Sequence, residues 1–419
     1  MKRYAFSKVG VALLFSILSV MPPSDGFAAS TISKSNQAQK KSITPVDSKL
    51  IAANTQFGFK LFDQLTKQDA GKNVFVSPSS VTFALAMIYN GASGETQQAM
   101  AKALEVNGMS LQELNRANAA LQAILASSDP KVQLNIANSL WAKKGVTFMP
   151  EFIKRNQDFY AAEVSDLDFA LPSAPATINN WVNQKTNGKI DKIVETIPSD
   201  AILYLINAIY FKGAWAQQFE KSKTKESRFT LLNGAKKQHP MMSQTGRYGY
   251  LENDEFQAIG LPYGAGSMSM YVFLPGKNSN LNAFLANLNA AKWESWMSQL
   301  RPQEGNITLP RFKLEYEVVL NNALKSLGME SAFDPQRANF REMSAASPSA
   351  NVFIGEVKHK TFVEVNEEGT EAAAVTSGGI RATAFIPPFN MVVDRPFFCA
   401  IRDNQTGTIL FMGSIVEPK

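Results

Sequence analysis

The sequence predicts one α+β domain, because helical patterns dominate its first half and strand patterns its second half. Between residues 50 and 65, apolar side chains recur every three or four positions, which is typical of an amphipathic helix. From Met268 to Leu274, apolar residues alternate with their neighbours, as in a β-strand. The two kinds of pattern do not alternate as strand–helix units, and no composition break follows residue 47.

The remaining elements follow the same two periodicities along the chain. Further helices are expected at residues 80–90, 95–104, 111–126, 150–158, 177–187 and 316–327. Further strands are expected at residues 134–142, 203–212, 306–314, 352–365, 389–401 and 408–416.

The first 28 residues have the layout of a secretory signal peptide. A basic start precedes an apolar stretch at residues 9–21, and small residues end the segment. About a dozen apolar residues are too few to span a bilayer, so cleavage is expected rather than anchoring. Residues 29–46 are polar and are expected to form a flexible spacer before the folded domain at 47–419. We therefore expect the mature protein to be secreted or periplasmic.

Composition and motifs argue against an enzyme and against a nucleic-acid or membrane partner. The formal charge of +6 is spread along the chain without long basic runs. The sequence contains no Gly-x-Ser-x-Gly, His-Glu-x-x-His, phosphate-loop or dinucleotide motif. Cys399, the only cysteine, lies in an apolar run and is expected to be buried and inert, whereas His239 is expected at the surface or in a turn. His239 and His359 lack the neighbouring ligands of a zinc site, so we expect no metal and no cofactor.

The most informative segment is residues 363–388. It begins as a strand and continues after Gly369 with small residues that are almost all uncharged. Its small side chains at alternate positions share one face of an extended chain: Thr370, Ala372, Ala374 and Thr376. A flexible surface loop is the plainest interpretation of such a composition. However, loop composition alone would not keep one face uncharged while Glu371 occupies the other.

This segment resembles the reactive-centre loop of serpins. The match to the hinge of that loop comprises Glu367, Glu368, Gly369, Thr370, Glu371, Ala372, Ala373 and Ala374. The likeness covers residues 48–418 through ordered motifs at 73–80, 180–190, 207–215, 309–312, 327–329, 394–397 and 411–413. The resemblance implies the serpin fold, with about eight to nine helices, three β-sheets and an exposed reactive-centre loop.

The resemblance also implies roles for residues outside the loop. It assigns Ser77, Ser80, Asn207 and His359 to the shutter, a polar cluster beneath the sheet where strands part. It assigns Trp215 to the breach, where insertion begins. From the residues alone, His359 would be a hydrogen-bonded core histidine and Trp215 a large core aromatic. Residues 109–126, where relatives place a basic cofactor-binding helix, contain a single Lys or Arg, which argues against heparin activation.

The function implied by the resemblance is suicide inhibition of serine proteases by a monomeric protein. The target protease would cleave the loop and form an acyl-enzyme, and insertion of the cut loop into the central sheet would trap this covalent complex. A charge on the inserting face would cost several kcal/mol to bury. The uncharged hinge therefore favours an inhibitor over a non-inhibitory serpin that acts as a carrier, storage protein or chaperone.

Two ways of counting place the reactive bond at neighbouring positions. Counting from Glu367 gives the bond between Thr383 and Ala384, whereas counting back from the double proline gives the bond between Ala384 and Phe385. Either bond follows a small residue, which suits an elastase-like or subtilisin-like protease. The alternative is the bond between Arg381 and Ala382, which suits a trypsin-like protease but shortens the segment available for insertion.

Overall fold

The computed structural model describes residues 47–127, 129–198, 201–344, 351–369 and 387–419. The expected signal peptide at 1–28 and the spacer at 29–46 lie outside these ranges. So do the hinge residues Thr370, Glu371, Ala372, Ala373 and Ala374, together with Thr376 and the candidate reactive-bond residues Arg381, Ala382, Thr383, Ala384 and Phe385. Within the described ranges, no helix is both long enough and apolar enough to cross a membrane.

Nine α-helices occur in the described ranges. They are α1 (Ser48–Gln68), α2 (Pro78–Tyr89), α3 (Gly94–Ala103), α4 (Leu111–Ser127), α5 (Pro150–Tyr160), α6 (Ala174–Lys185), α7 (Leu281–Asn287), α8 (Ala290–Gln299) and α9 (Asn321–Leu324). Short helical turns follow at Lys221–Lys223, Lys325–Met329 and Glu330–Phe333. Every residue of α2 is buried, so this helix forms part of the core, and Pro78 at its first position is preorganised for the helix.

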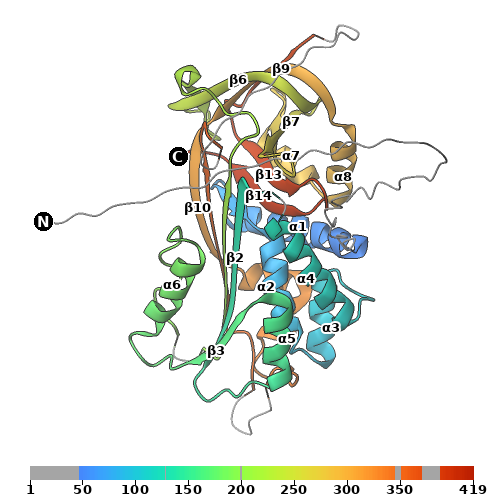
Figure 1. Ribbon diagram of the computed structural model, residues 1–419, viewed down its shortest axis with the longest axis vertical. Coiled ribbons are helices and arrows are strands. Elements are labelled where there is room, and N and C mark those ends of the chain that lie inside the picture. Colours follow the sequence, from blue (N-terminus) through green and yellow to red (C-terminus); the bar gives the residue numbers. More distant parts are fainter. Residues whose placement is uncertain (1–46, 128, 199–200, 345–350, 370–386) are drawn as a thin grey trace, which may run out of the picture. The chain divides into compact units, whose positions relative to one another are not determined.

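The strands comprise a five-stranded sheet and a larger assembly. The five-stranded sheet has the order β10 (Phe312–Val319), β11 (Glu356–Val365), β4 (Leu203–Gly213), β2 (Val132–Lys143) and β3 (Glu163–Leu167). Figure 1 shows α6 on one face of this sheet and α2 on the other. Because both faces are covered, β4 is an almost continuous run of buried residues, while the edge strand β10 alternates buried and exposed positions.

The larger assembly contains the remaining strands. They are β1 (Val74–Val76), β5 (Lys225–Thr230), β6 (Lys236–Glu252), β7 (Phe256–Tyr263), β8 (Met268–Pro275), β9 (Arg301–Pro310), β12 (Phe389–Val392), β13 (Phe397–Asp403) and β14 (Ile409–Ile415). Their order is β1-β14-β13-β8-β7-β6-β9-β12, with β5 paired to β6. The long strand β6 pairs with β9 over most of its length and with β7 near its end. Through this shared strand, the larger assembly is one hydrogen-bonded sheet. The described strands therefore form two hydrogen-bonded sheets, whereas the family resemblance implied three.

Three predicted elements differ from the structure. Residues 316–319 belong to strand β10 rather than to a helix, because the spacing of four from Tyr316 to Leu320 fits a strand period as well as a helix period. The predicted strand at 306–314 is divided between β9 and β10, and the predicted strand at 389–401 is divided between β12 and β13.

Candidate functional site

The central feature of the five-stranded sheet is the junction between β4 and β11, which we call the seam. These two strands run parallel, with paired residues from Tyr204 and Glu356 to Tyr210 and Phe362. The last three residues of each strand extend beyond this pairing, at the end of the sheet where β11 leads into the hinge. The seam is therefore closed over most of its length and ends just before the hinge.

Gly369 already links the two strands at this end. It forms antiparallel bridges with Asn366, which follows β11, and with Ala214, which follows β4. Its φ of +109° lies in the region that favours glycine, and a Cβ atom there would stand 2.4 Å from the backbone nitrogen of Trp215. A glycine is therefore required both by the backbone conformation and by the close approach of the neighbouring chain.

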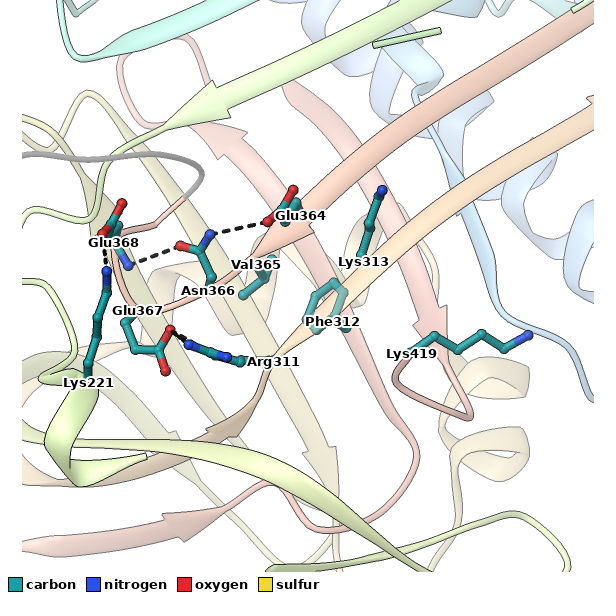
Figure 2. Close-up of a pocket in the computed structure, with 10 residues that line it drawn as sticks. All are labelled: Lys221, Arg311, Phe312, Lys313, Glu364, Val365, Asn366, Glu367, Glu368 and Lys419. Atoms are coloured by element: carbon teal, nitrogen blue, oxygen red, sulfur yellow. Dashed lines mark hydrogen bonds and ion pairs between the residues drawn. The ribbon is translucent and has the colours of Figure 1, made fainter. Parts of the chain in front are cut away.

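The first hinge acid, Glu367, is almost completely buried, with 1% of its surface exposed. The guanidinium of Arg311 donates to its Oε2 atom, at 2.8 Å from Nε, and the hydroxyl of Thr224 donates to its Oε1 atom (Figure 2). Burial alone would raise the pKa of Glu367, but these hydrogen bonds outweigh burial and lower the pKa. The charged Glu367 carboxylate, both of whose oxygens accept hydrogen bonds, thus fixes the hinge to Arg311, between β9 and β10, and to Thr224, just before β5.

The second hinge acid is held more loosely. Glu368 pairs with Lys221 at the surface, and its backbone N–H donates to Asn366. These groups line a pocket of about 340 Å³, whose walls carry both signs of charge (Figure 2). The lining residues are Lys221, Arg311, Phe312, Lys313, Glu364, Val365, Asn366, Glu367, Glu368 and Lys419.

The four residues expected in the shutter form one hydrogen-bonded cluster beneath the seam, and all four are fully buried. The backbone N–H of Ser77 donates to His359 Nε2 at 3.1 Å. His359 Nδ1 therefore carries the proton and donates to Asn207 Oδ1. The Asn207 amide then donates to Ser80 Oγ at 2.6 Å and to Asn138 Oδ1. Because Asn207 and His359 are direct partners across the seam, the cluster bridges the two strands.

Burial controls the protonation of this cluster. It lowers the pKa of His359 to about 3, although the hydrogen bond with Asn207 acts in the opposite direction. The imidazole is therefore neutral at physiological pH, as its role of acceptor toward Ser77 requires.

Trp215, expected in the breach, lies beside the hinge. Its ring stacks on Tyr263 at a centroid distance of 4.4 Å, and its Nε1 atom donates to the carbonyl oxygen of Asn366 at 2.9 Å. Its backbone N–H donates to the carbonyl oxygen of Glu368. The structure thus brings Trp215 together with Glu367, Glu368 and Gly369, while the shutter residues lie farther along the seam, at the level of His359.

Sequence reasoning missed several partners in this site, notably Asn138, Arg311 and Thr224. It was also wrong about His239, which is buried in β6 and shares a hydrogen bond with the carbonyl oxygen of Arg311. Cys399 is buried as expected, and burial raises the pKa of its thiol. In the described part of the chain, no group of three or more His, Cys, Asp or Glu side chains could hold a metal ion.

Comparisons with known proteins agree with this geometry. The family model described as "Serpin (serine protease inhibitor)" matches residues 52–418. The human leukocyte elastase inhibitor is 36% identical over 381 residues, which cover 88% of this chain and 99% of that protein. The native crystal structure of the thermophilic serpin tengpin matches with a TM-score of 0.81 and 35% identity, covering 89% of this chain and 95% of that one. Human thyroxine-binding globulin matches with a TM-score of 0.80 and 27% identity, covering 89% and 99%.

The family model spans nearly all of the described residues, and the relatives align along almost their full length. The seam, the hinge and the buried polar cluster all lie inside the matched region. This chain therefore belongs to the serpin family and has the serpin fold.

Proposed function

We propose that this protein is a suicide inhibitor of serine proteases, whose cleaved reactive loop inserts into the seam between β4 and β11. The observation that carries the proposal is the double bridge at Gly369. A chain that continues from Gly369 back along the seam would run antiparallel to both strands. It would replace one parallel pairing by two antiparallel pairings, which are slightly more stable per residue.

The two bridges of Gly369 define one consistent register for such a strand. Counting from the bridge with Asn366, residue 373 would lie opposite Phe362. Counting from the bridge with Ala214, residue 373 would lie opposite Tyr210. Phe362 and Tyr210 are already partners across the seam, so both counts agree. In the same register, Thr376 would lie between His359 and Asn207.

This register also predicts which side chains would turn inward. On β11, Val363 belongs to the main core and Thr361 donates to the carbonyl oxygen of Phe75, so these alternate positions face the interior. Residues directly opposite each other share one face of a sheet. The inward residues of the inserted strand would be Thr370, Ala372, Ala374 and Thr376. They are the small uncharged residues of the loop, whereas Glu371 would face outward beside Glu364.

The targets that we propose are elastase-like or subtilisin-like proteases, cleaving between Thr383 and Ala384 or between Ala384 and Phe385. The small residues at these positions support this choice, and so does the similarity to a protein named leukocyte elastase inhibitor. A trypsin-like protease cleaving between Arg381 and Ala382 is the alternative.

We also propose that the chain is exported and that residues 1–28 are removed. The basic and apolar layout of this segment supports the proposal. The family match begins at residue 52, and the leukocyte elastase inhibitor is aligned over 99% of its length while 88% of this chain is used. The leader and the spacer at 29–46 would thus be additions before the common fold.

The experiment is incubation of the protein with an elastase, followed by denaturing electrophoresis and intact-mass analysis. A working inhibitor would form a covalent complex and release a C-terminal peptide whose mass identifies the cleaved bond. The nicked protein would also melt at a higher temperature than the intact one. Thr370→Arg would abolish the complex and leave an ordinary substrate, because its side chain would turn inward. Glu371→Arg is the matched control, since its side chain would face outward and the complex would persist.

A non-inhibitory carrier is the second candidate, because thyroxine-binding globulin has the same fold at 27% identity. Cleavage by every protease of a panel without any complex, and without a rise in the melting temperature, would favour the carrier over the inhibitor.

A further inference from the structure

His239 is a buried histidine that lies outside the seam and the shutter. It belongs to β6, on the inward side with Met241, and 6% of its surface is exposed. A polar ring at such a position costs free energy unless it is hydrogen-bonded. Its partner is the backbone carbonyl oxygen of Arg311, 2.5 Å from Nε2. Because a carbonyl oxygen can only accept, Nε2 carries the proton and donates to it.

Arg311 is the single residue between β9 and β10, and β6 holds both polar groups of its backbone. The Arg311 N–H donates to the carbonyl oxygen of Pro240 at 3.0 Å, and its own carbonyl oxygen accepts from His239. The ladder between β6 and β9 ends just before it, where Met241 lies opposite Pro310. Since Arg311 belongs to neither strand, these two hydrogen bonds, rather than a strand ladder, hold its backbone in place.

The side chain of Arg311 joins this fixed backbone to the hinge. Its Nε and Nη2 atoms both donate to the same oxygen of Glu367 (Figure 2), and charge-assisted bonds of this kind depend on alignment. The other Glu367 oxygen accepts from Thr224, directly before β5. Strand β5 pairs with β6, starting where Lys225 lies opposite Met241. Both partners of the hinge acid therefore either belong to the β5–β6 hairpin and its approach or are held by it.

We propose that His239 is a positioning residue for loop insertion, which holds Arg311 so that the guanidinium keeps Glu367 in place. This inference rests on the proposed insertion into the seam. The hinge has to stay in register, because Gly369 supplies the first two bridges of the new strand. If the Arg311 backbone shifted, Glu367 would lose its aligned cation, and the register at Gly369 would have to form again after cleavage. Insertion would then start later, and more of the acyl-enzyme would be hydrolysed.

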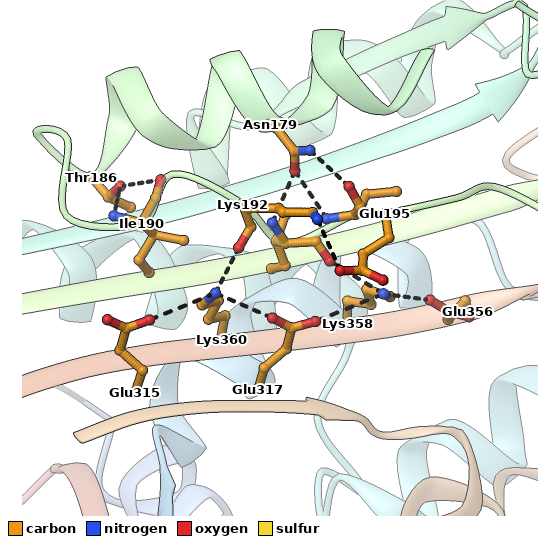
Figure 3. A network of polar contacts seen from close by, with 12 residues as sticks. Asn179, Thr186, Ile190, Lys192, Glu195, Glu315, Glu317, Glu356, Lys358 and Lys360 are labelled. Atoms are coloured by element: carbon orange, nitrogen blue, oxygen red, sulfur yellow. Dashed lines mark hydrogen bonds and ion pairs between the residues drawn. The ribbon is translucent and has the colours of Figure 1, made fainter. Parts of the chain in front are cut away.

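The outer face of the seam carries a separate polar network, centred on Lys358 and Lys360 of β11 (Figure 3). Among the described residues, no hydrogen bond or ion pair joins this network to His239, Arg311 or Glu367. His239 also lies in the larger sheet, whereas this network and the shutter follow the five-stranded sheet. A change at His239 therefore acts on the hinge without altering the contacts along the seam.

The test counts how many acyl-enzymes are hydrolysed for each one trapped, using a protease that the wild type inhibits. The count comes from the amounts of cleaved inhibitor and of covalent complex after complete reaction. His239→Leu removes the donor at similar volume, and its hydrolysed-to-trapped ratio is expected to be about fivefold higher than in the wild type, the factor that corresponds to one net hydrogen bond. His239→Gln, whose amide nitrogen can take the place of the ring Nε2, should behave like the wild type. The rate of loop cleavage should be equal in all three proteins.

Hydrogen exchange of the intact protein tests the hinge without any protease. The Phe219 amide donates to the carbonyl oxygen of Glu367 at 2.9 Å, and the Trp215 amide donates to that of the next residue. Both amides should exchange about fivefold faster in His239→Leu and at the wild-type rate in His239→Gln. The effect should also pass through the hinge acid. In a Glu367→Gln background, His239→Leu should therefore raise the hydrolysed-to-trapped ratio no further.

The matched control is Tyr160→Phe, which removes the buried hydrogen bonds of the Tyr160 hydroxyl with Asn115 and Asn118. Tyr160 ends α5, well away from β6 (Figure 1). This variant should lose stability but keep the hydrolysed-to-trapped ratio of the wild type. If His239→Leu fails to fold, His239→Asn replaces it, because its shorter amide cannot reach the Arg311 carbonyl oxygen.

A wild-type ratio and wild-type amide exchange in His239→Leu would overturn the positioning role while leaving inhibition intact. So would an equal rise of the ratio in His239→Gln, or a full further rise in the Glu367→Gln background. If the wild type forms no complex with any protease, the proposed inhibition itself is overturned, and the exchange measurements alone then decide whether His239 holds the hinge.

Discussion

The buried imidazole of His359 makes the stability of the folded protein sensitive to mild acid. The pKa of His359 is lowered to about 3 by burial, whereas an unfolded chain would have a histidine pKa of about 6.5. Below pH 6.5 the unfolded state binds a proton that the folded state does not bind, so stability falls as the pH decreases from about 6.5 toward 3. Each pH unit in this window costs about 1.4 kcal/mol, which gives a loss of about 2 kcal/mol between pH 7 and pH 5.

The assay is urea unfolding of the intact protein at pH 7, 6 and 5, compared with a His359→Gln variant. The variant loses part of the cluster around Asn207 and Ser77, so it should be less stable at pH 7, but its residue 359 is neutral at every pH. All other titrating groups are shared and cancel in the comparison. The stability difference between the two proteins should therefore shrink by about 2 kcal/mol from pH 7 to pH 5. A difference that does not change with pH would refute the reasoning.

Two further predictions concern the hinge, and both are checked by thermal unfolding of the intact protein. Arg311→Met leaves the buried Glu367 carboxylate without its cation and should cost about 3 kcal/mol, whereas Lys221→Met removes an exposed ion pair and should cost less than about 1 kcal/mol. Equal effects would contradict the buried position of the hinge acid. Gly369→Ala combines a strained φ with a clash and should cost about 2–3 kcal/mol. Gly108 has a similar φ of +83° but open space around it, so Gly108→Ala is expected to lower the stability by about 1 kcal/mol. Equal losses of stability in the two variants would show that the added methyl group at position 369 does not clash with the neighbouring chain.

The sequence predicted elements best where one periodicity stood alone. The amphipathic pattern between residues 50 and 65 lies wholly within α1, which runs from Ser48 to Gln68. The pattern at 316–327 fitted both the helix period and the strand period. The alternation of charged and apolar residues in β10 continues through residue 319, and these residues form a strand. Strand β6 was missed because Pro240 and two glycines interrupt a 17-residue segment with irregular burial. In these places tertiary pairing, rather than local propensity, determines the structure.

The candidate site was predictable to a similar degree. His359 and Asn207 were identified through a family resemblance, but Asn138 was not, because its position opposite Asn207 depends on the register between β2 and β4. Likewise, nothing local to Glu367 indicates Arg311, which precedes it by 56 residues and meets it only through the packing of β10 against β11. Contacts between strands far apart in sequence require the register, and a single sequence does not contain it.

The double bridge at Gly369 has a kinetic consequence for a sheet that gains a strand. When a strand is added cooperatively, the first residue pair is the costly one, because the chain loses conformational entropy there before many hydrogen bonds compensate for it. In this protein the bridges at Gly369 exist before any cleavage. The new strand would therefore start from a completed nucleus and extend by propagation alone. An inhibitor of the proposed kind, whose insertion competes with hydrolysis of the acyl-enzyme ester, would benefit from having no nucleation delay.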